Sequence, residues 1–144
     1  MQKCGGSPLT SPPISKGKRG KLRRAGGGRG VIVFVFDPGR KGAPTPCPPV
    51  TVGVGIGGNM EKCALLAKYS LTRPIGEHNS DERYAKLEEE LLERINKTGI
   101  GPAGLGGTTT AAAVNIEYAP THIGALPVAV NLNCHAARRA YAVL

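Results

Sequence analysis

Residues 47–58 read CPPVTVGVGIGG, and this stretch decides how the rest of the chain is interpreted. Its β-branched and apolar residues predict a buried strand over residues 49–56. Three glycines, Gly53, Gly55 and Gly57, weaken that strand, and glycine inside a strand indicates that another group approaches the backbone closely. The sequence therefore predicts a central strand with something packed directly against it.

The same stretch also has the spacing of a dinucleotide-binding turn, G-x-G-x-x-G, at Gly53, Gly55 and Gly58. Such a turn needs an acidic residue at the end of the next strand, about 20 residues further on, to bind the ribose. Here two helical patterns follow with no strand between them. A second glycine-rich loop, GPAGLGGT at residues 101–108, has Gly107 where a phosphate-binding loop needs lysine. We therefore expect neither loop to bind a nucleotide.

A first helix is predicted directly after this strand, in NMEKCALLAKYSLTR at residues 59–73. Asn59 is a suitable N-cap, and Pro74 ends the pattern. Cys63 is surrounded by apolar residues, and we place it in the core. The apolar face of this helix is predicted to hold three further residues, Leu65, Leu66 and Tyr69.

A second helix is predicted in SDERYAKLEEELLERINKTG, residues 80–99. Ser80 or Asp81 caps its start, and Gly99 ends it. The charged residues lie on one side, which we expect to face solvent. The apolar residues fall at helical spacing and are Tyr84, Leu87, Leu91, Leu92 and Ile95.

Two more strands are predicted in the C-terminal half, at residues 111–120 and 122–134, where apolar residues alternate or run continuously. A short helix is predicted for residues 135–144, and a strand ended by Asp-Pro-Gly for residues 30–39. The order of these elements indicates an α/β fold, with a mixed sheet and helices packed on it.

The basic charge of the chain is concentrated at its N-terminal end. The formal net charge is +9, and residues 1–43 hold ten Lys and Arg against one acid, so the remainder is neutral. Residues 1–30 are rich in Gly, Pro, Ser, Lys and Arg, and we expect them to be disordered or poorly packed. The chain is therefore divided into a basic low-order segment, 1–43, and one folded region, 44–144. A basic tail that binds nucleic acid is the alternative interpretation, although we do not expect nucleic acid as a partner.

We expect a cytoplasmic protein with no membrane partner. No stretch approaches the roughly 18 consecutive apolar residues of a membrane-spanning helix, and the first residues lack the pattern of a secretion signal. Four cysteines, Cys4, Cys47, Cys63 and Cys134, are too few and too widely spaced for a disulfide scaffold. They are reduced thiols or metal ligands. An iron-sulfur cluster suits thiols near glycine-rich loops, because the backbone N–H groups there can approach the cluster sulfides, whereas inert core cysteines are the alternative.

Three segments resemble one known family. They are CPPVTVGVGIGGNMEKCALLAK, RYAKLEEELLERINKTGIGPAGLGGTTTAAAVNIE and APTHIGALPVAVNLNCHAARRAYAVL, and the stretch that contains them, from about Pro46 to Leu144, covers about two thirds of the chain. In order and content they resemble the α subunit, or N-terminal catalytic region, of class I fumarate hydratases and L-tartrate dehydratases. The resemblance implies a 4Fe-4S hydro-lyase that adds or removes water at a dicarboxylic acid.

The resemblance also implies roles for particular residues. Cys47 in the CPP motif and Cys134 in the NxxCHAxRRA motif correspond to two of three cluster ligands, and His122 to an active-site histidine. Arg138 and Arg139 are candidates for offsetting the charge of the substrate or cluster. The glycines taken as cofactor-binding are Gly55, Gly57, Gly58, Gly106 and Gly107.

The first 40 or so residues depart from the family pattern. Members carry a C-Q-D-T-G motif that supplies the third cysteine ligand, and the chain has no such motif, so Cys4 is not assigned. We interpret residues 1–43 as foreign to the family, as a shifted reading frame or a mispredicted start would make them. The resemblance further implies a β subunit or C-terminal domain as partner, in a higher oligomer of αβ units. The chain alone is therefore predicted to be inactive.

Overall fold

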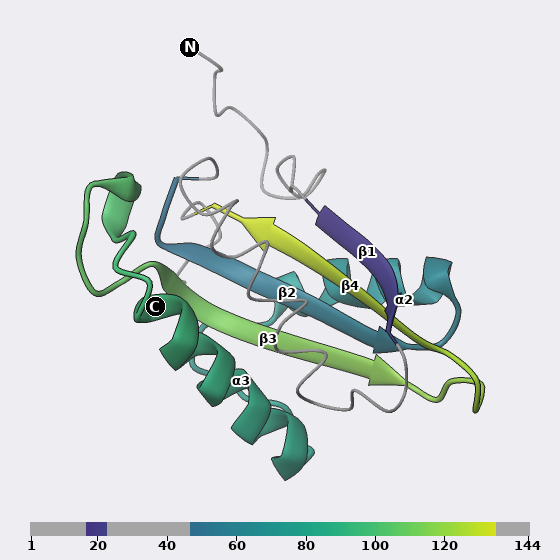
Figure 1. Cartoon of the computed structure of the whole chain (residues 1–144). Coiled ribbons are helices and arrows are strands. Elements are labelled where there is room, and N and C mark those ends of the chain that lie inside the picture. The colour runs from purple at the N-terminus through teal and green to yellow at the C-terminus, as the bar shows by residue number, and fades with distance from the viewer. Residues whose placement is uncertain (1–16, 23–46, 135–144) are drawn as a thin grey trace, which may run out of the picture.

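The computed structural model describes the backbone of residues 17–22 and the structure of residues 47–134 (Figure 1). It contains a four-stranded sheet in the order β1-β4-β2-β3. The strands are β1 (Gly17–Leu22), β2 (Val50–Gly57), β3 (Ala111–Ala119) and β4 (Leu126–Asn133). β2 and β3 are parallel, whereas β4 runs antiparallel to both β1 and β2. The predicted α/β fold with a mixed sheet is confirmed.

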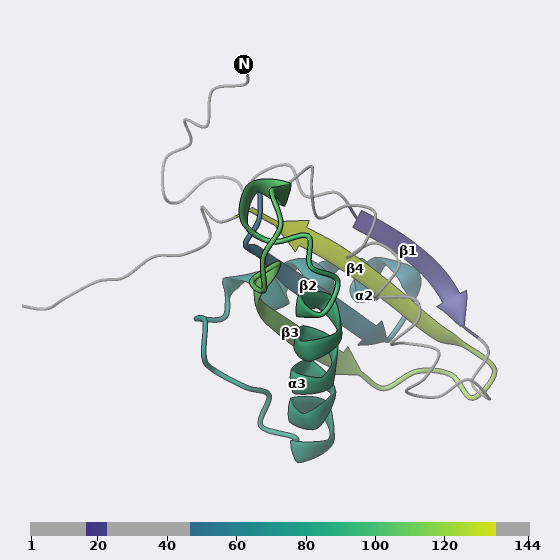
Figure 2. The same cartoon turned by 60° about the vertical axis from the view of Figure 1, so that its left-hand side comes forward.

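The connection from β2 to the parallel strand β3 contains two α-helices, which cover opposite faces of the sheet (Figure 2). They are α2 (Met60–Tyr69) and α3 (Glu82–Asn96), and short 3-10 helices follow at Ser70–Thr72 and Pro102–Gly104. Asn59 caps α2 by accepting a hydrogen bond from the Lys62 amide at 2.7 Å. Ser80 and Asp81 were both predicted as possible N-caps of α3. The N-cap is Asp81, whose Oδ1 accepts a hydrogen bond from the Arg83 amide at 3.0 Å.

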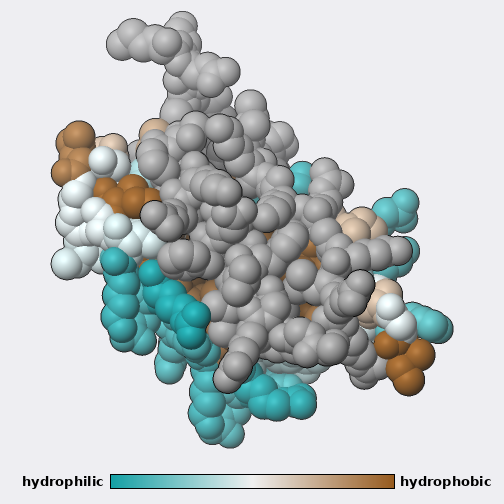
Figure 3. Space-filling view, viewed as in Figure 1, coloured by the Kyte–Doolittle hydropathy of each residue, from teal (hydrophilic) through white to brown (hydrophobic). Residues whose placement is uncertain are grey.

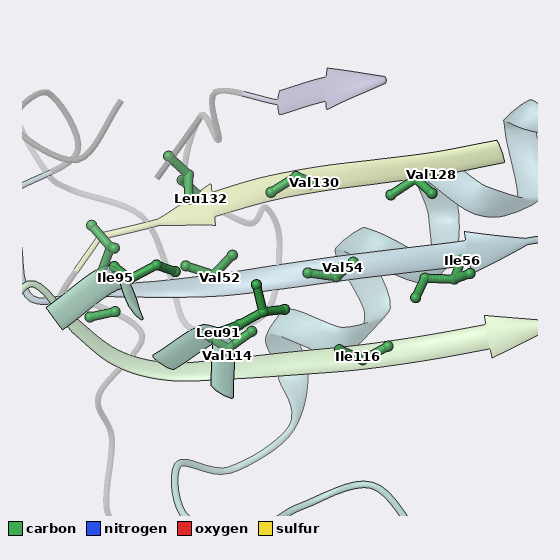
Figure 4. Close-up of a cluster of buried hydrophobic side chains, with 12 residues drawn as sticks. Val52, Val54, Ile56, Leu91, Ile95, Val114, Ile116, Val128, Val130 and Leu132 are labelled. Carbon is green, nitrogen blue, oxygen red and sulfur yellow. The ribbon is translucent and has the colours of Figure 1, made fainter. Parts of the chain in front are cut away.

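The α3 face of the sheet carries the main hydrophobic core (Figure 4). Side chains alternate along a strand, so every second residue of β2 points to this side. Leu91 and Ile95 of α3 are fully buried against it, as predicted. The remaining strand residues of the core are Val50, Val52, Val54, Ile56, Ala111, Val114, Ile116, Val128, Val130 and Leu132.

The outer side of α3 is charged and faces solvent, which also agrees with the prediction. Three exposed ion pairs join residues four apart along it: Glu82 with Lys86, Glu90 with Arg94, and Glu93 with Lys97. Figure 3 shows hydrophilic atoms gathered where α3 lies, below the centre of the view. Exposed pairs of this kind contribute little to stability and chiefly keep the helix surface soluble.

The α2 face of the sheet is lined by glycine. A Cβ atom added to Gly55 would lie 2.1 Å from the carbonyl oxygen of Cys63, and one added to Gly53 would lie 2.3 Å from that of Ala67. The close approach predicted from the glycines is therefore made by the chain's own helix. Cys63 and Ala67 are buried in this contact, together with Ala129 of β4.

The predicted apolar face of α2 is wrong. Leu65 and Tyr69 are each 66% exposed, whereas Cys63 and Ala67 are buried. Glycine in the strand brings the helix so close that only small side chains fit between the two elements. Size therefore selects the buried face here: Leu65 and Tyr69 point outward, whereas Leu66, the third residue of the predicted face, is half-buried.

Side chains cover the outer edge of β3 at two places, Ile116 and Ala111. The Ile116 amide donates to Glu88 Oε1 at 2.7 Å, and the Ile116 carbonyl accepts from Arg73 Nη2 at 2.9 Å and Asn79 Nδ2 at 2.7 Å. At the start of the strand, Asn96 Oδ1 accepts from the Ala111 amide at 2.8 Å. Another strand could otherwise pair with these backbone groups of Ile116 and Ala111. They are hydrogen-bonded to side chains of the same chain instead.

The N-terminal part differs from the prediction at one place. Residues 1–30 were expected to be disordered or poorly packed, yet Gly17–Leu22 forms β1, paired with β4 from Gly17 opposite Asn131 to Leu22 opposite Leu126. A free β4 edge accepts any extended backbone that presents N–H and C=O groups, whatever its side chains. The predicted strand at residues 30–39 and the predicted helix at residues 135–144 lie outside the described residues. Among the helices that are described, none has the length and apolarity to cross a bilayer.

Candidate functional site

Cys47 and Cys134 lie at the same end of the sheet. β2 begins at Val50 and β4 ends at Asn133, and these strands are antiparallel neighbours with Thr51 opposite Asn133. Cys134 follows the last residue of β4, and Cys47 precedes the first residue of β2 by three positions. Strand pairing therefore places two cysteines that are 87 positions apart in the sequence at the same end of the sheet.

The glycine-rich loop of residues 99–110 reaches the same end. The Ala103 amide donates to the Pro48 carbonyl at 3.1 Å, and the Val50 amide donates to the Thr110 carbonyl at 3.0 Å. Gly106 and Gly107 are exposed on this loop, with φ of +93° and +128°. A Cβ atom at Gly106 would meet nothing within 4 Å, so the backbone is open to a ligand there.

Both thiols are accessible to a ligand. Cys47 is exposed, with φ of 54°, and Cys134 is half-buried, with its amide donating to Asn133 Oδ1 at 3.0 Å. Thiolates are the ligands that iron-sulfur clusters and zinc prefer. Within residues 47–134 these two form a pair and not a full set, since no cluster of three or more His, Cys, Asp and Glu is placed to hold a metal. The donor type fits a cluster, and within the described residues these two cysteines are the thiols at this end of the sheet.

His122 lies at the opposite end of the sheet, between the end of β3 at Ala119 and the start of β4 at Leu126. It is exposed, and its Nδ1 accepts from the Gly124 amide at 3.1 Å. The eight residues of β4 separate this end from Cys134, which corresponds to about 25 Å at roughly 3.3 Å per residue. The structure therefore does not bring His122 to the cysteine pair of the same chain.

The predicted glycines are divided in the same way. Gly57 and Gly58 lie at the histidine end, where a Cβ atom on Gly57 would be 2.0 Å from the Ala119 carbonyl oxygen. Gly55 lies under α2, whose backbone fills the space beside it. Only Gly106 and Gly107 share the cysteine end. The cofactor role of all five glycines stays a prediction, and Arg138 and Arg139 lie outside the described residues.

Cys63 is a core residue, as predicted. Its side chain is fully buried, and its thiol donates to the Gly55 carbonyl at 3.1 Å. Burial raises the pKa of the Cys63 thiol from 9.0 to about 11, because the thiolate would be desolvated. A thiol held protonated in this way is a poor metal ligand.

This raised pKa predicts a loss of stability at high pH. Below pH 9.0 the thiol is protonated in both states, whereas between 9.0 and about 11 the unfolded chain loses the proton and the folded chain keeps it. The free energy of unfolding is expected to fall by up to about 1.4 kcal/mol for each pH unit in this window. Urea unfolding of the wild type and of Cys63→Ala measures it. An equal pH dependence in both proteins would contradict the assignment.

Two residues that position the cysteine end, Asn96 and Thr110, were missed in the sequence. Asn96 ends α3, and its Oδ1 accepts from both the Thr110 and Ala111 amides at 2.8 Å. Thr110 is fully buried although Thr108 and Thr109 beside it are exposed. Nothing in the run of three threonines distinguishes the buried one, because the distinction depends on where the preceding helix ends.

The fold and this site together define a class: an α/β chain that presents a pair of thiols beside a glycine-rich loop. Comparison with known families makes the assignment more definite. The model of the fumarate hydratase (Fumerase) family matches residues 1–143, and the chain belongs to this family. The matched range crosses the predicted boundary at residue 43, and that division of the chain stays a prediction.

The relatives are described as α subunits. The chain is 46% identical over 119 residues to the putative L(+)-tartrate dehydratase subunit alpha of Methanocaldococcus jannaschii, covering 83% of the chain and 42% of that protein. It is 41% identical over 123 residues to the L(+)-tartrate dehydratase subunit alpha of Escherichia coli, covering 85% of the chain and 41% of that protein. The chain spans about two fifths of the length of these curated relatives.

Proposed function

We propose that the chain is part of an iron-sulfur hydro-lyase, which adds or removes water at a dicarboxylic acid such as fumarate or tartrate. Membership of the fumarate hydratase family supports the reaction class. The observation that carries the cofactor is the register of β2 and β4, which sets Cys47 and Cys134 at one end of the sheet. The alternative, a binding module with a basic tail for nucleic acid, rests on residues 1–30, most of which lie outside the described residues, and it stays a prediction.

In this proposal Cys47 and Cys134 hold two corners of a 4Fe-4S cluster. When bound, such a cluster supplies an iron that acts as a Lewis acid toward the hydroxyl group that leaves. The exposed loop beside the Cys47 end, with Gly106 and Gly107, would leave room for the cluster, because a Cβ atom added at Gly106 meets nothing within 4 Å. Cys63 takes no part, because its thiol is buried and hydrogen-bonded within the core.

The remaining groups come from further chain. We propose a β subunit or C-terminal domain as partner, since the matched relatives are α subunits, and αβ units that associate further in the cytoplasm. Arg138 and Arg139 directly follow the Cys134 motif and would offset the negative charge of substrate or cluster. His122 would contribute to a site at the other end of the sheet from its own cysteines.

Removal of either cysteine tests the proposal. The full chain is titrated with Co²⁺ under anaerobic conditions, and thiolate-to-metal absorption reports binding. Cys47→Ser and Cys134→Ser are each expected to weaken binding by more than the roughly 10–100-fold that loss of an outer-shell partner costs, because each removes a direct ligand. Cys63→Ala is the matched control and is expected to bind as the wild type does. A Cys47→Ser protein that binds Co²⁺ like the wild type would refute the thiol pair.

A further inference from the structure

We propose that Thr110 is a positioning residue for Cys47 and acts through the loop of residues 99–110. The inference rests on the proposed function, in which Cys47 is a metal ligand. The hydrogen bonds described for Thr110 go to other residues than Cys47. Thr110 holds three segments whose placement fixes the backbone next to Cys47.

All the polar groups of Thr110 are used, each toward a different segment. Its amide donates to Asn96 Oδ1 at 2.8 Å, at the end of α3. Its Oγ1 accepts from the Gly101 amide at 3.1 Å, at the start of the loop. Its carbonyl accepts from the Val50 amide at 3.0 Å, at the start of β2. A single fully buried residue therefore joins the helix end, the loop and the strand that follows Cys47.

The loop carries this constraint to the residue next to Cys47. It closes on itself, because the Gly106 amide donates to the Ile100 carbonyl at 2.8 Å and the space beside Gly101 is filled by Gly106. The Ala103 amide then donates to the Pro48 carbonyl at 3.1 Å. If the start of the loop moves, the donor for Pro48 moves with it.

The segment between Cys47 and β2 has few backbone donors of its own. Pro48 and Pro49 have no N–H group, so its backbone hydrogen bonds must use carbonyl groups or the Val50 amide. Both of the hydrogen bonds described for it, at Pro48 and at Val50, come from loop 99–110 or its last residue. Cys47 itself has a left-handed backbone, with φ of 54°, a conformation that non-glycine residues keep only when their surroundings enforce it.

The hydroxyl group is what distinguishes Thr110 from an apolar residue of the same shape. Thr110→Val keeps the volume and removes the acceptor, so the buried Gly101 amide loses its partner and the loop has to shift to find water. Thr110→Ser keeps the acceptor and is the conservative rescue. Thr109→Val is a matched control, since Thr109 is exposed. Thr121→Val is a second control, since Thr121 Oγ1 donates to two carbonyls at the histidine end of the sheet.

Two measurements on the full chain test the inference. The first is the affinity for Co²⁺, which Thr110→Val is expected to lower roughly 10–100-fold, the usual effect of losing a residue that orients a ligand. The second is amide hydrogen exchange, in which the Val50 and Ala103 amides are expected to exchange faster in Thr110→Val than in the wild type. Thr110→Ser, Thr109→Val and Thr121→Val are expected to keep the wild-type affinity.

The outcomes separate this inference from the proposed function. A folded Thr110→Val protein with wild-type affinity for Co²⁺ would overturn the positioning role and leave the thiol pair intact. Equal losses in Thr110→Val and Thr121→Val would also overturn it, because general destabilisation would then explain both. A wild-type chain that binds no Co²⁺ through its thiols would instead refute the proposed function, and the positioning role with it.

Discussion

Replacement of Glu88 by alanine is expected to lower the free energy of unfolding by about 3–5 kcal/mol, the usual effect of breaking a buried ion pair by removing one partner. Glu88 is 1% exposed and faces the Arg73 guanidinium, with Oε1 2.7 Å from Nη1. Arg73 also pairs with Glu117, whose side chain is a quarter exposed. Without Glu88, the Arg73 guanidinium keeps the Ile116 carbonyl and the less buried Glu117, which is then its one described carboxylate partner.

The carboxylate does more than balance a charge. Glu88 Oε1 also accepts from the Ile116 amide at 2.7 Å, and Oε2 accepts from the Asn79 amide at 3.1 Å. Alanine would leave both backbone N–H groups without an acceptor, and a buried donor that is left unsatisfied costs about 1–3 kcal/mol. The loss therefore affects the loop before α3 and the edge of β3 together.

Chemical denaturation of Glu88→Ala beside Glu89→Ala measures this effect. Glu89 is the next residue of α3 and is exposed, so its replacement is expected to change the free energy of unfolding by no more than about 0.5 kcal/mol. If the two variants were equally stable, Glu88 would not be the buried centre of this network.

The second large effect is expected at Gly55. A Cβ atom there would lie 2.1 Å from the Cys63 carbonyl oxygen and 2.7 Å from the Ala67 amide nitrogen. Both are backbone atoms of α2 and cannot rotate away, so the whole helix must move outward and lose its packing on β2. Overpacking of a core typically costs about 1–3 kcal/mol, and we expect Gly55→Ala at the upper end of this range.

Gly124→Ala is the control for this substitution. Gly124 is exposed, and its added Cβ would be 3.5 Å from His122 Nδ1, an ordinary contact. Its thermal unfolding is expected to match that of the wild type, whereas Gly55→Ala is expected to unfold at a clearly lower temperature. A Gly55→Ala chain as stable as the wild type would show that α2 does not rest directly on β2.

The two helices show what the sequence could predict about the fold. In α3 the apolar residues are large and recur at helical spacing, so the pattern itself identifies Leu91 and Ile95 as core residues. In α2 the glycines of the facing strand select small residues, and a search for large apolar side chains picks Leu65 and Tyr69, which are exposed. A helical pattern thus has to be interpreted together with the strand that it packs on.

The roles of the candidate site residues stay predictions, and the structure adds where the described ones lie. The family resemblance points to Cys47, Cys134 and His122, and sequence order gives no information on which of these meet. Strand direction decides it: β4 runs antiparallel to β2, so its last residue meets the start of β2. His122 precedes β4 and is therefore left at the far end. The partners that hold the cysteine end, Asn96 and Thr110, become visible only once the helix end and the strand start are placed.

The side chains that cover part of the β3 edge affect how the chain behaves in concentrated solution. A bare edge strand is a template on which strands of other molecules assemble into aggregates or fibrils. Here Asn96 accepts from the Ala111 amide at one end of β3, and Glu88 accepts from the Ile116 amide in the middle, so these groups are not available to another strand. These contacts exist only in the native fold. A substitution in the Glu88 network would therefore leave the chain prone to self-assembly as well as less stable.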